Sequence, residues 1–188
     1  MAIYNNVFSE YEIKDSSIKF EDGESYEKVG CVGSIDESLE TITVTKKCEG
    51  KVVKSVTRGS GNGELTISLH MKYNLFVEMF GMESDSLKDG VLGYGQDSRH
   101  KNFSFVARVM DEDGNVKYVA YPKLIIQSGL AGKIENGAEE VAEIEITATV
   151  QPDEYGFAKY EAVEEGLDES IATAWMTSFA PSLVKKAE

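Results

Sequence analysis

Alternating apolar and polar side chains recur along most of the chain and predict β-strands. The pattern is cleanest in residues 65–70 and 143–150. Successive side chains of a strand point to opposite faces, so each stretch predicts a strand with one buried face and one polar face. In the second stretch the polar face would carry Glu143, Glu145, Thr147 and Thr149.

Two hairpins follow from the turn residues that separate such strands. Residues 39–46 are rich in Thr, Ile and Val, and Glu49-Gly50 supplies a turn before KVVKSVT. Farther along, FSFVARVM and VKYVAYPK flank the segment 111–115, whose Gly and Asn tolerate positive φ angles. Pro122 cannot donate to a ladder, so we expect the second strand to bend or lie at an edge there.

One segment departs from the two-residue period and predicts a helix around residues 72–80. Tyr73, Phe76, Val77 and Phe80 follow the spacing i, i+3, i+4, i+7, and Leu75 and Met79 broaden this apolar stripe. Gly81 suits the C-terminal end of the helix. The residues from 83 to 100 are dense in Gly, Ser and Asp and predict a long excursion. A single helix among strands favours a mainly β fold, a β-sandwich with one packed helix.

The character of the chain changes after Pro152, where acidic residues accumulate. We therefore predict a β-sandwich domain with an N-terminal arm over 1–151 and an acidic C-terminal extension or contact arm over 152–188. Within the extension, Leu167, Ile171, Ala174 and Trp175 have helical spacing. Trp175 could equally anchor a strand, and the pattern leaves both interpretations open.

Composition limits the possible partners of the chain. Its 188 residues carry a formal net charge of −14, which disfavours binding to a phosphate backbone. No apolar stretch approaches the roughly 18 residues of a membrane span, so we expect no membrane insertion. Cys31 and Cys48 lack metal-ligand spacing, and we expect free, buried thiols.

Candidate catalytic and metal motifs fail in their context. The glycine-rich run 59–63 precedes a strand rather than a helix, so a turn between strands is favoured over a phosphate loop. The segment 111–115 resembles the start of a calcium-binding loop, but its Gly114 is at the fourth position, whereas such a loop needs glycine at the sixth position. Only two histidines occur, and acidic pairs arise from 33 acidic residues by composition alone. We expect a protein that is not an enzyme and holds no cofactor or metal.

Basic residues gather in the first predicted hairpin and its exit, whereas the segments 10–40 and 153–169 are strongly acidic. The basic residues are Lys46, Lys47, Lys51, Lys54 and Arg58. Opposite patches on one chain favour head-to-tail contacts between copies, which close into rings or continue as filaments. A merely patchy monomer surface accounts for the same charges, so charge alone leaves both interpretations open.

Four elements follow one another over roughly residues 27–151. They are the hairpin ending SVTRGSGNGELTISLH, the helix MKYNLFVEMFGM, the loop LKDGVLGYGQDS, and FSFVARVMDEDGNVKYVAYPKLII. This order of elements resembles the major tail proteins, or tail tube proteins, of phages that infect Gram-positive bacteria.

The resemblance implies hexameric rings whose inner strands join into one β-barrel, and rings that stack into a tube for DNA passage. It also implies a place in the virion tail, assembled in the host cytoplasm, with tape-measure, tail-tip and terminator proteins as partners. Glu143, Glu145, Thr147 and Thr149 would then line the lumen. The basic hairpin, the loop 83–100 and the chain ends, including Trp175, would make contacts between subunits. A flexible tail, a contractile tail and a tail-like bacteriocin would all fit.

Two other classes compete with this interpretation: a carbohydrate-binding or adhesin-type β-sandwich, and a hydrolase that uses acidic pairs. An adhesin should display exposed aromatic residues for stacking on sugars. A hydrolase should bring carboxylates together in a pocket.

Overall fold

The computed structural model describes residues 4–132, 134, 136–137 and 141–186, and in this part of the chain strands predominate. The strands are β1 Glu12–Phe20, β2 Glu27–Lys28, β3 Gly30–Cys48, β4 Lys51–Met71, β5 Phe103–Met110, β6 Val116–Ile126, β7 Ile144–Val150 and β8 Tyr160–Val163. The helices are α1 Tyr73–Met79, a 3-10 turn Glu164–Gly166, α2 Glu169–Ser178 and α3 Pro181–Val184. The predicted mainly β class, with a helix near residues 72–80, is confirmed.

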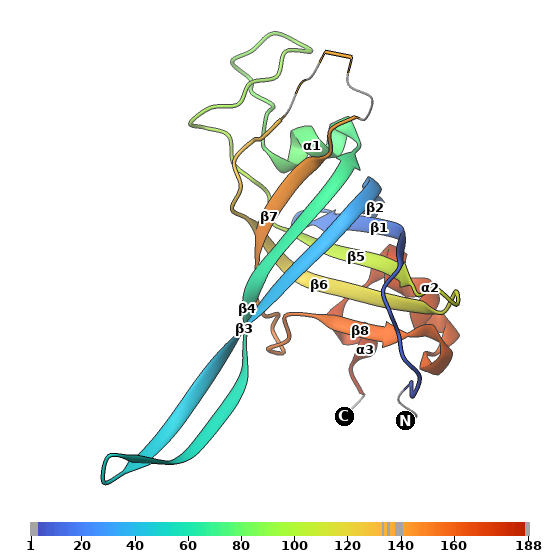
Figure 1. The fold of residues 1–188 in the computed structure, drawn as a ribbon. Coiled ribbons are helices and arrows are strands. Elements are labelled where there is room, and N and C mark those ends of the chain that lie inside the picture. The colour runs from blue at the N-terminus through green and yellow to red at the C-terminus, as the bar shows by residue number, and fades with distance from the viewer. Residues whose placement is uncertain (1–3, 133, 135, 138–140, 187–188) are drawn as a thin grey trace.

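Among the described residues the strands form one antiparallel sheet in the order β2-β1-β5-β6-β7-β4-β3, with β8 also paired to β6. The sheet folds over on itself, so β7, β4 and β3 cross in front of β1, β5 and β6 (Figure 1). The fold occurs along β6, which pairs with β7 only over Leu124–Ile126. The sheet does not close into a barrel.

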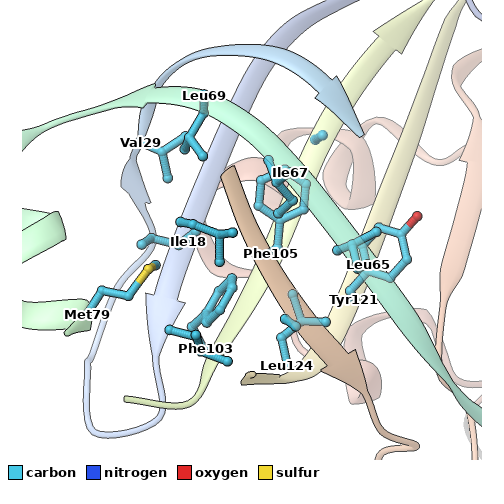
Figure 2. Close-up of a cluster of buried hydrophobic side chains, with 14 of the residues drawn as sticks. Ile18, Val29, Leu65, Ile67, Leu69, Met79, Phe103, Phe105, Tyr121 and Leu124 are labelled. Carbon is cyan, nitrogen blue, oxygen red and sulfur yellow. The ribbon is translucent and has the colours of Figure 1, made fainter. Parts of the chain in front are cut away.

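The main core lies between the two layers of the folded sheet (Figure 2). Alternate residues of β4 and β7 point inward, and they meet inward side chains of β1, β5 and β6. The largest of these buried side chains include Leu65, Leu69, Phe105, Leu124 and Ile146. Because these positions follow the two-residue period, the alternation in the sequence is accounted for by one-sided burial.

Helix α1 closes one end of this core, and the predicted apolar stripe is buried or partly buried except at its first residue. Leu75, Val77 and Met79 are buried, and so is Phe80 just beyond the helix. Tyr73, the first residue of the predicted stripe, is 68% exposed. Gly81 follows with φ of +59°, and a Cβ there would lie 2.4 Å from the Arg99 carbonyl oxygen, so the position requires glycine.

The C-terminal segment packs on the outer face of β5 and β6, and Trp175 belongs to a helix rather than to a strand. Helix α2 is capped at its N-terminus by Asp168, whose side chain accepts a hydrogen bond from the backbone N–H of Ser170. Trp175 is 1% exposed, lies with its ring 5.8 Å from that of Tyr118, and donates from Nε1 to the Val119 carbonyl. A second, smaller core forms around it.

Two turn predictions have different outcomes. The turn at residues 111–115 is confirmed: the Asp111 carboxylate accepts hydrogen bonds from the backbone N–H groups of Asp113 and Asn115 and from the Asn115 side chain. These bonds hold the Asp111 pKa below its ordinary value, although burial acts against them. The turn predicted in the glycine-rich run is wrong, because β4 continues through it. Residues 60–62 form a bulge there instead, since Leu39 pairs with Gly63 and Thr41 with Gly59.

The prediction of buried thiols is also wrong. Cys31 and Cys48 are both free and exposed. Cys31 is paired with the exposed residue His70, and Cys48 lies beside the Glu49-Gly50 turn among exposed residues, so neither reaches a core.

Candidate assembly surfaces

The outer surface of the β3-β4-β7 layer carries small hydroxyl side chains and carboxylates in three rows of directly paired residues, and the exposed pair Cys31 and His70 follows beyond them. The rows are Ser34, Ser68 and Glu145; Asp36, Thr66 and Thr147; and Ser38, Glu64 and Thr149. We call these nine residues the polar face. Its other side is the core, because Leu65, Ile67, Ile146 and Ala148 point inward from the same strands.

Three of the four predicted lumen residues, Glu145, Thr147 and Thr149, therefore lie together on the polar face. Thr147 is partly buried against Thr66, with 3.4 Å between the two hydroxyl oxygens. Glu143 lies just before β7 and is exposed, and its carboxylate rests against Gly33, where a Cβ would come within 2.1 Å of Oε1. Their role as a lumen lining stays a prediction.

The polar face combines three carboxylates with no basic residue. No ion pair of the described residues involves Asp36, Glu64 or Glu145. Unpaired exposed carboxylates keep their field directed into solvent, so this surface repels polyanions at distances of about a Debye length.

Beyond Leu39 and Gly63 the β3-β4 hairpin pairs only with itself and projects from the body (Figure 1). We call residues 39–63 the hairpin arm. Its turn, Glu49 and Gly50, has positive φ angles of 50° and 77°, as a two-residue hairpin turn requires. The predicted turn at this position is confirmed.

The two faces of the hairpin arm differ in chemistry. Paired residues share a face, and one face carries the apolar pair Val44–Val56, flanked by Ile42–Arg58 and Lys46–Lys54. The opposite face carries Thr43 and Thr57, whose hydroxyl oxygens lie 2.8 Å apart. Val44 is 60% exposed and Val56 48%, although both are strongly apolar. An isolated two-stranded ribbon is marginally stable in water, so this surface favours a binding partner.

The predicted contact residues fall into two groups in the structure. Lys46, Lys47, Lys51, Lys54 and Arg58 all lie exposed on the hairpin arm. Trp175 does not lie with them, because it is buried inside its own chain. A contact of Trp175 with another copy stays a prediction, and it would require α2 to leave its own sheet.

A cleft of about 260 Å³ opens between β1 and the base of β3, where the sheet fails to close. We call it the seam cleft. Its floor is apolar, and its rim is charged. The floor consists of Ile13, Ile35, Val109, Val119 and Tyr121, and the charged rim residues are Glu10, Glu12, Glu37 and Lys159.

A hydrogen-bonded network fixes the inner wall of the seam cleft. The Glu37 carboxylate accepts from the Tyr121 hydroxyl at 2.6 Å and from Lys159 Nζ at 2.5 Å. Burial alone would raise the pKa of Glu37, but these two hydrogen bonds lower it overall. Burial would lower the pKa of Lys159, but its bonds to Glu37 and Glu161 raise it overall. The pair is thus held in its charged form.

Sequence reasoning missed the seam cleft and six of the nine polar-face residues. The alternation of Thr66 and Ser68 with Leu65 and Ile67 is visible in the sequence and could have added the β4 residues. The seam cleft has no such signal, because its residues come together only through strand pairing.

The described part of the chain contains no helix long and apolar enough to cross a membrane. Within the same residues, no group of three or more His, Cys, Asp or Glu side chains is placed to hold a metal ion.

Comparisons with known proteins give no family. No family model matches the chain, and no curated protein matches it. The chain is similar to a solved structure described as the cryo-EM structure of the anti-feeding prophage cap, the AFP tube terminating cap. The identity is 13% and the TM-score 0.42, over 87% of this chain and 99% of that chain. A likeness of this size does not indicate function, and the function proposed below is based on the surfaces of this chain and on its sequence.

Proposed function

We propose that the chain is a structural, non-catalytic subunit that assembles with copies of itself into a phage-type tail tube. Hexameric rings stack, and the polar face lines the channel through which DNA passes. The tube becomes part of the virion tail, where it meets the tape-measure, tail-tip and terminator proteins. The tail-tube class comes from the resemblance of residues 27–151, and the polar face and the free edge of β3 support it.

The polar face is the observation that carries the proposal. A channel for DNA needs a lining that neither binds phosphates nor stacks with bases. The polar face has no basic and no aromatic residue, and its three carboxylates repel the DNA backbone. Within the residues that the structure describes, β3 pairs on one edge only, so a neighbouring copy can extend the polar face sideways.

Self-assembly can be tested on the purified chain. Electron microscopy across a concentration series should show rings or hollow tubes, since association follows mass action. A chain that remains monomeric at high concentration, both alone and with preformed tail tips as nuclei, would contradict the proposal.

The lining can be tested by reversing its charge. We predict that Glu143→Lys/Glu145→Lys tubes retain double-stranded DNA in co-sedimentation at low salt and slow DNA ejection from particles that carry them. The reason is that each lysine gains affinity by displacing condensed counterions. Glu165→Lys/Glu169→Lys is the matched control, because both glutamates are exposed on the C-terminal segment. Equal retention by the two double variants, or normal ejection, would sink the assignment of this face.

A further inference from the structure

The hairpin arm and the rest of the chain carry opposite net charge. Residues 39–63 contain five basic and two acidic residues, a net charge of +3, so the remaining residues carry −17. No ion pair among the described residues includes a lysine of the hairpin arm or Arg58. The basic side chains of the arm are therefore not satisfied by their own body, and an acidic partner fits them.

The apolar face of the hairpin arm sets a second requirement on that partner. Val44 and Val56 form an exposed pair between basic neighbours, so the partner must offer an apolar floor with carboxylates around it. The polar face has carboxylates but only Ser and Thr between them. It therefore fails the apolar half of the requirement.

The seam cleft meets both requirements. Ile13, Ile35 and Val119 lie on its floor, and Glu10 and Glu12 stand on its rim. The side chains of these two glutamates are 59% and 47% exposed even though each touches a lysine. Arm lysines can therefore approach them from solvent.

The hairpin arm cannot enter the seam cleft of its own chain. The cleft wall includes Ile35 and Glu37, and the arm starts two residues later at Leu39 on the same strand. Ten extended residues lead from Leu39 to Cys48, a reach of about 30 Å away from the cleft. An arm that fills the cleft must therefore belong to another copy.

We propose that the hairpin arm of one copy docks in the seam cleft of a second copy. Val44 and Val56 cover the apolar floor, while Lys46, Lys54 and Arg58 face the rim carboxylates. Arm and cleft are different surfaces of one chain, so the contact is heterologous and repeats from copy to copy. This inference rests on the proposed function, for which it supplies the joint between subunits.

A charge swap tests the joint. The arm variant is Lys46→Glu/Lys54→Glu/Arg58→Glu, and the cleft variant is Glu10→Lys/Glu12→Lys. Each variant alone should show an assembly midpoint at about tenfold higher protein concentration or more, because like charges then face one another. An equimolar mixture should recover assembly, since the reversed arm then meets the reversed cleft. Lys72→Glu/Lys88→Glu/Lys186→Glu, at three exposed lysines outside the arm, is the matched control.

A disulfide cross-link tests the same joint and leaves every charged residue of the hairpin arm unchanged. In a Cys31→Ser background Cys48 remains as the single native thiol, exposed near the arm tip. Adding Glu12→Cys should give an oxidation ladder of dimers, trimers and longer chains on non-reducing gels, whereas Glu165→Cys should not. Circular dichroism and a thermal melt confirm that each variant is folded.

The outcomes separate this inference from the proposed function. Wild-type rings or tubes together with an unaffected charge-swap series and no ladder would overturn the joint and leave the tube proposal standing. Absence of any wild-type assembly would overturn the tube proposal. A ladder under those conditions would still establish the arm-to-cleft contact.

Discussion

At the scale of single residues, Glu37 links three separate parts of the chain. It belongs to β3, its partner Tyr121 belongs to β6, and Lys159 precedes β8. The network therefore ties the base of the hairpin arm to the C-terminal segment across the seam cleft. Removing one partner of a half-buried charged pair leaves the other unsatisfied, so the three residues should behave as a unit.

We predict that the Glu37→Gln variant is less stable than the wild type at neutral pH and that the difference depends on pH. The folded-state pKa of Glu37 is lowered, so its contribution is present above the unfolded value of about 4.3 and disappears as pH falls through the folded value. The pKa of Lys159 is raised, so the contribution also disappears as pH rises above about 10.4 and through its folded value. Urea unfolding of both proteins across this range measures the difference. A difference that is constant down to pH 3 would contradict the prediction.

Trp175 is the second residue with a large expected effect. Trp175→Ala should lower the free energy of unfolding by about 3–5 kcal/mol, because it empties the centre of the smaller core. Trp175→Phe should cost less, since it keeps most of the apolar contact and loses the hydrogen bond to Val119. Urea unfolding followed by circular dichroism gives both values. Equal losses for the two variants would mean that the hydrogen bond, rather than packing, dominates.

At the scale of elements, the hairpin arm and the body obey different rules. The long strands of the body bury at least one face in a core, whereas every residue from Leu39 to Gly59 is exposed. The arm therefore contributes surface rather than core, and substitutions on it can alter association without altering the fold.

We predict that Val44→Thr/Val56→Thr leaves monomer stability within about 0.5 kcal/mol of wild type, because both side chains are exposed and Thr also suits a strand. Self-association should weaken, because the only strictly apolar cross-strand pair of that face is lost. Thr43→Ser/Thr57→Ser changes the opposite face and is the control. Analytical ultracentrifugation measures association. A larger effect of the control would contradict the prediction, because it would place the contact on the face of Thr43 and Thr57.

The strands and helix α1 could largely be predicted from the sequence, whereas the pairing of each strand with its neighbours in the sheet could not. Alternation in residues 65–70 and 143–150 identifies two strands, and the i, i+3, i+4 spacing identifies α1. Neither pattern says that Thr66 pairs with Thr147, which is what assembles the polar face. The turn predicted in the glycine-rich run is wrong for a related reason, because glycine marks both turns and bulges and only the partner strand distinguishes them. The burial predicted for Cys31 and Cys48 is wrong because the burial of a strand residue depends on whether another layer covers the face to which its side chain points.

At the scale of the whole molecule, charge is separated along the chain. A basic arm projects from a strongly acidic body, and the net charge of −14 opposes the approach of two bodies. A contact between the basic arm of one copy and the acidic body of the next would offset this repulsion.

We predict that the arm charge controls association at low salt only. Lys46→Gln/Lys54→Gln/Arg58→Gln should assemble more slowly than wild type at about 0.05 M salt, and the difference should vanish near 1 M, where the Debye length is about 3 Å. Light scattering gives the rates. A difference that persists at 1 M would show that the substitutions act through packing instead of charge.

The self-paired hairpin arm also has a consequence for how related chains can vary. Because the arm pairs only with itself beyond Leu39 and Gly63, its length can change without disturbing a single core residue. Adding two residues to each strand would extend the reach by about 7 Å and keep the valines on the same face. Adding one residue to each strand would turn that face over. Natural insertions and deletions in this ribbon should therefore come in even steps per strand, so that the spacing between neighbouring copies is a quantity that can evolve separately from the fold.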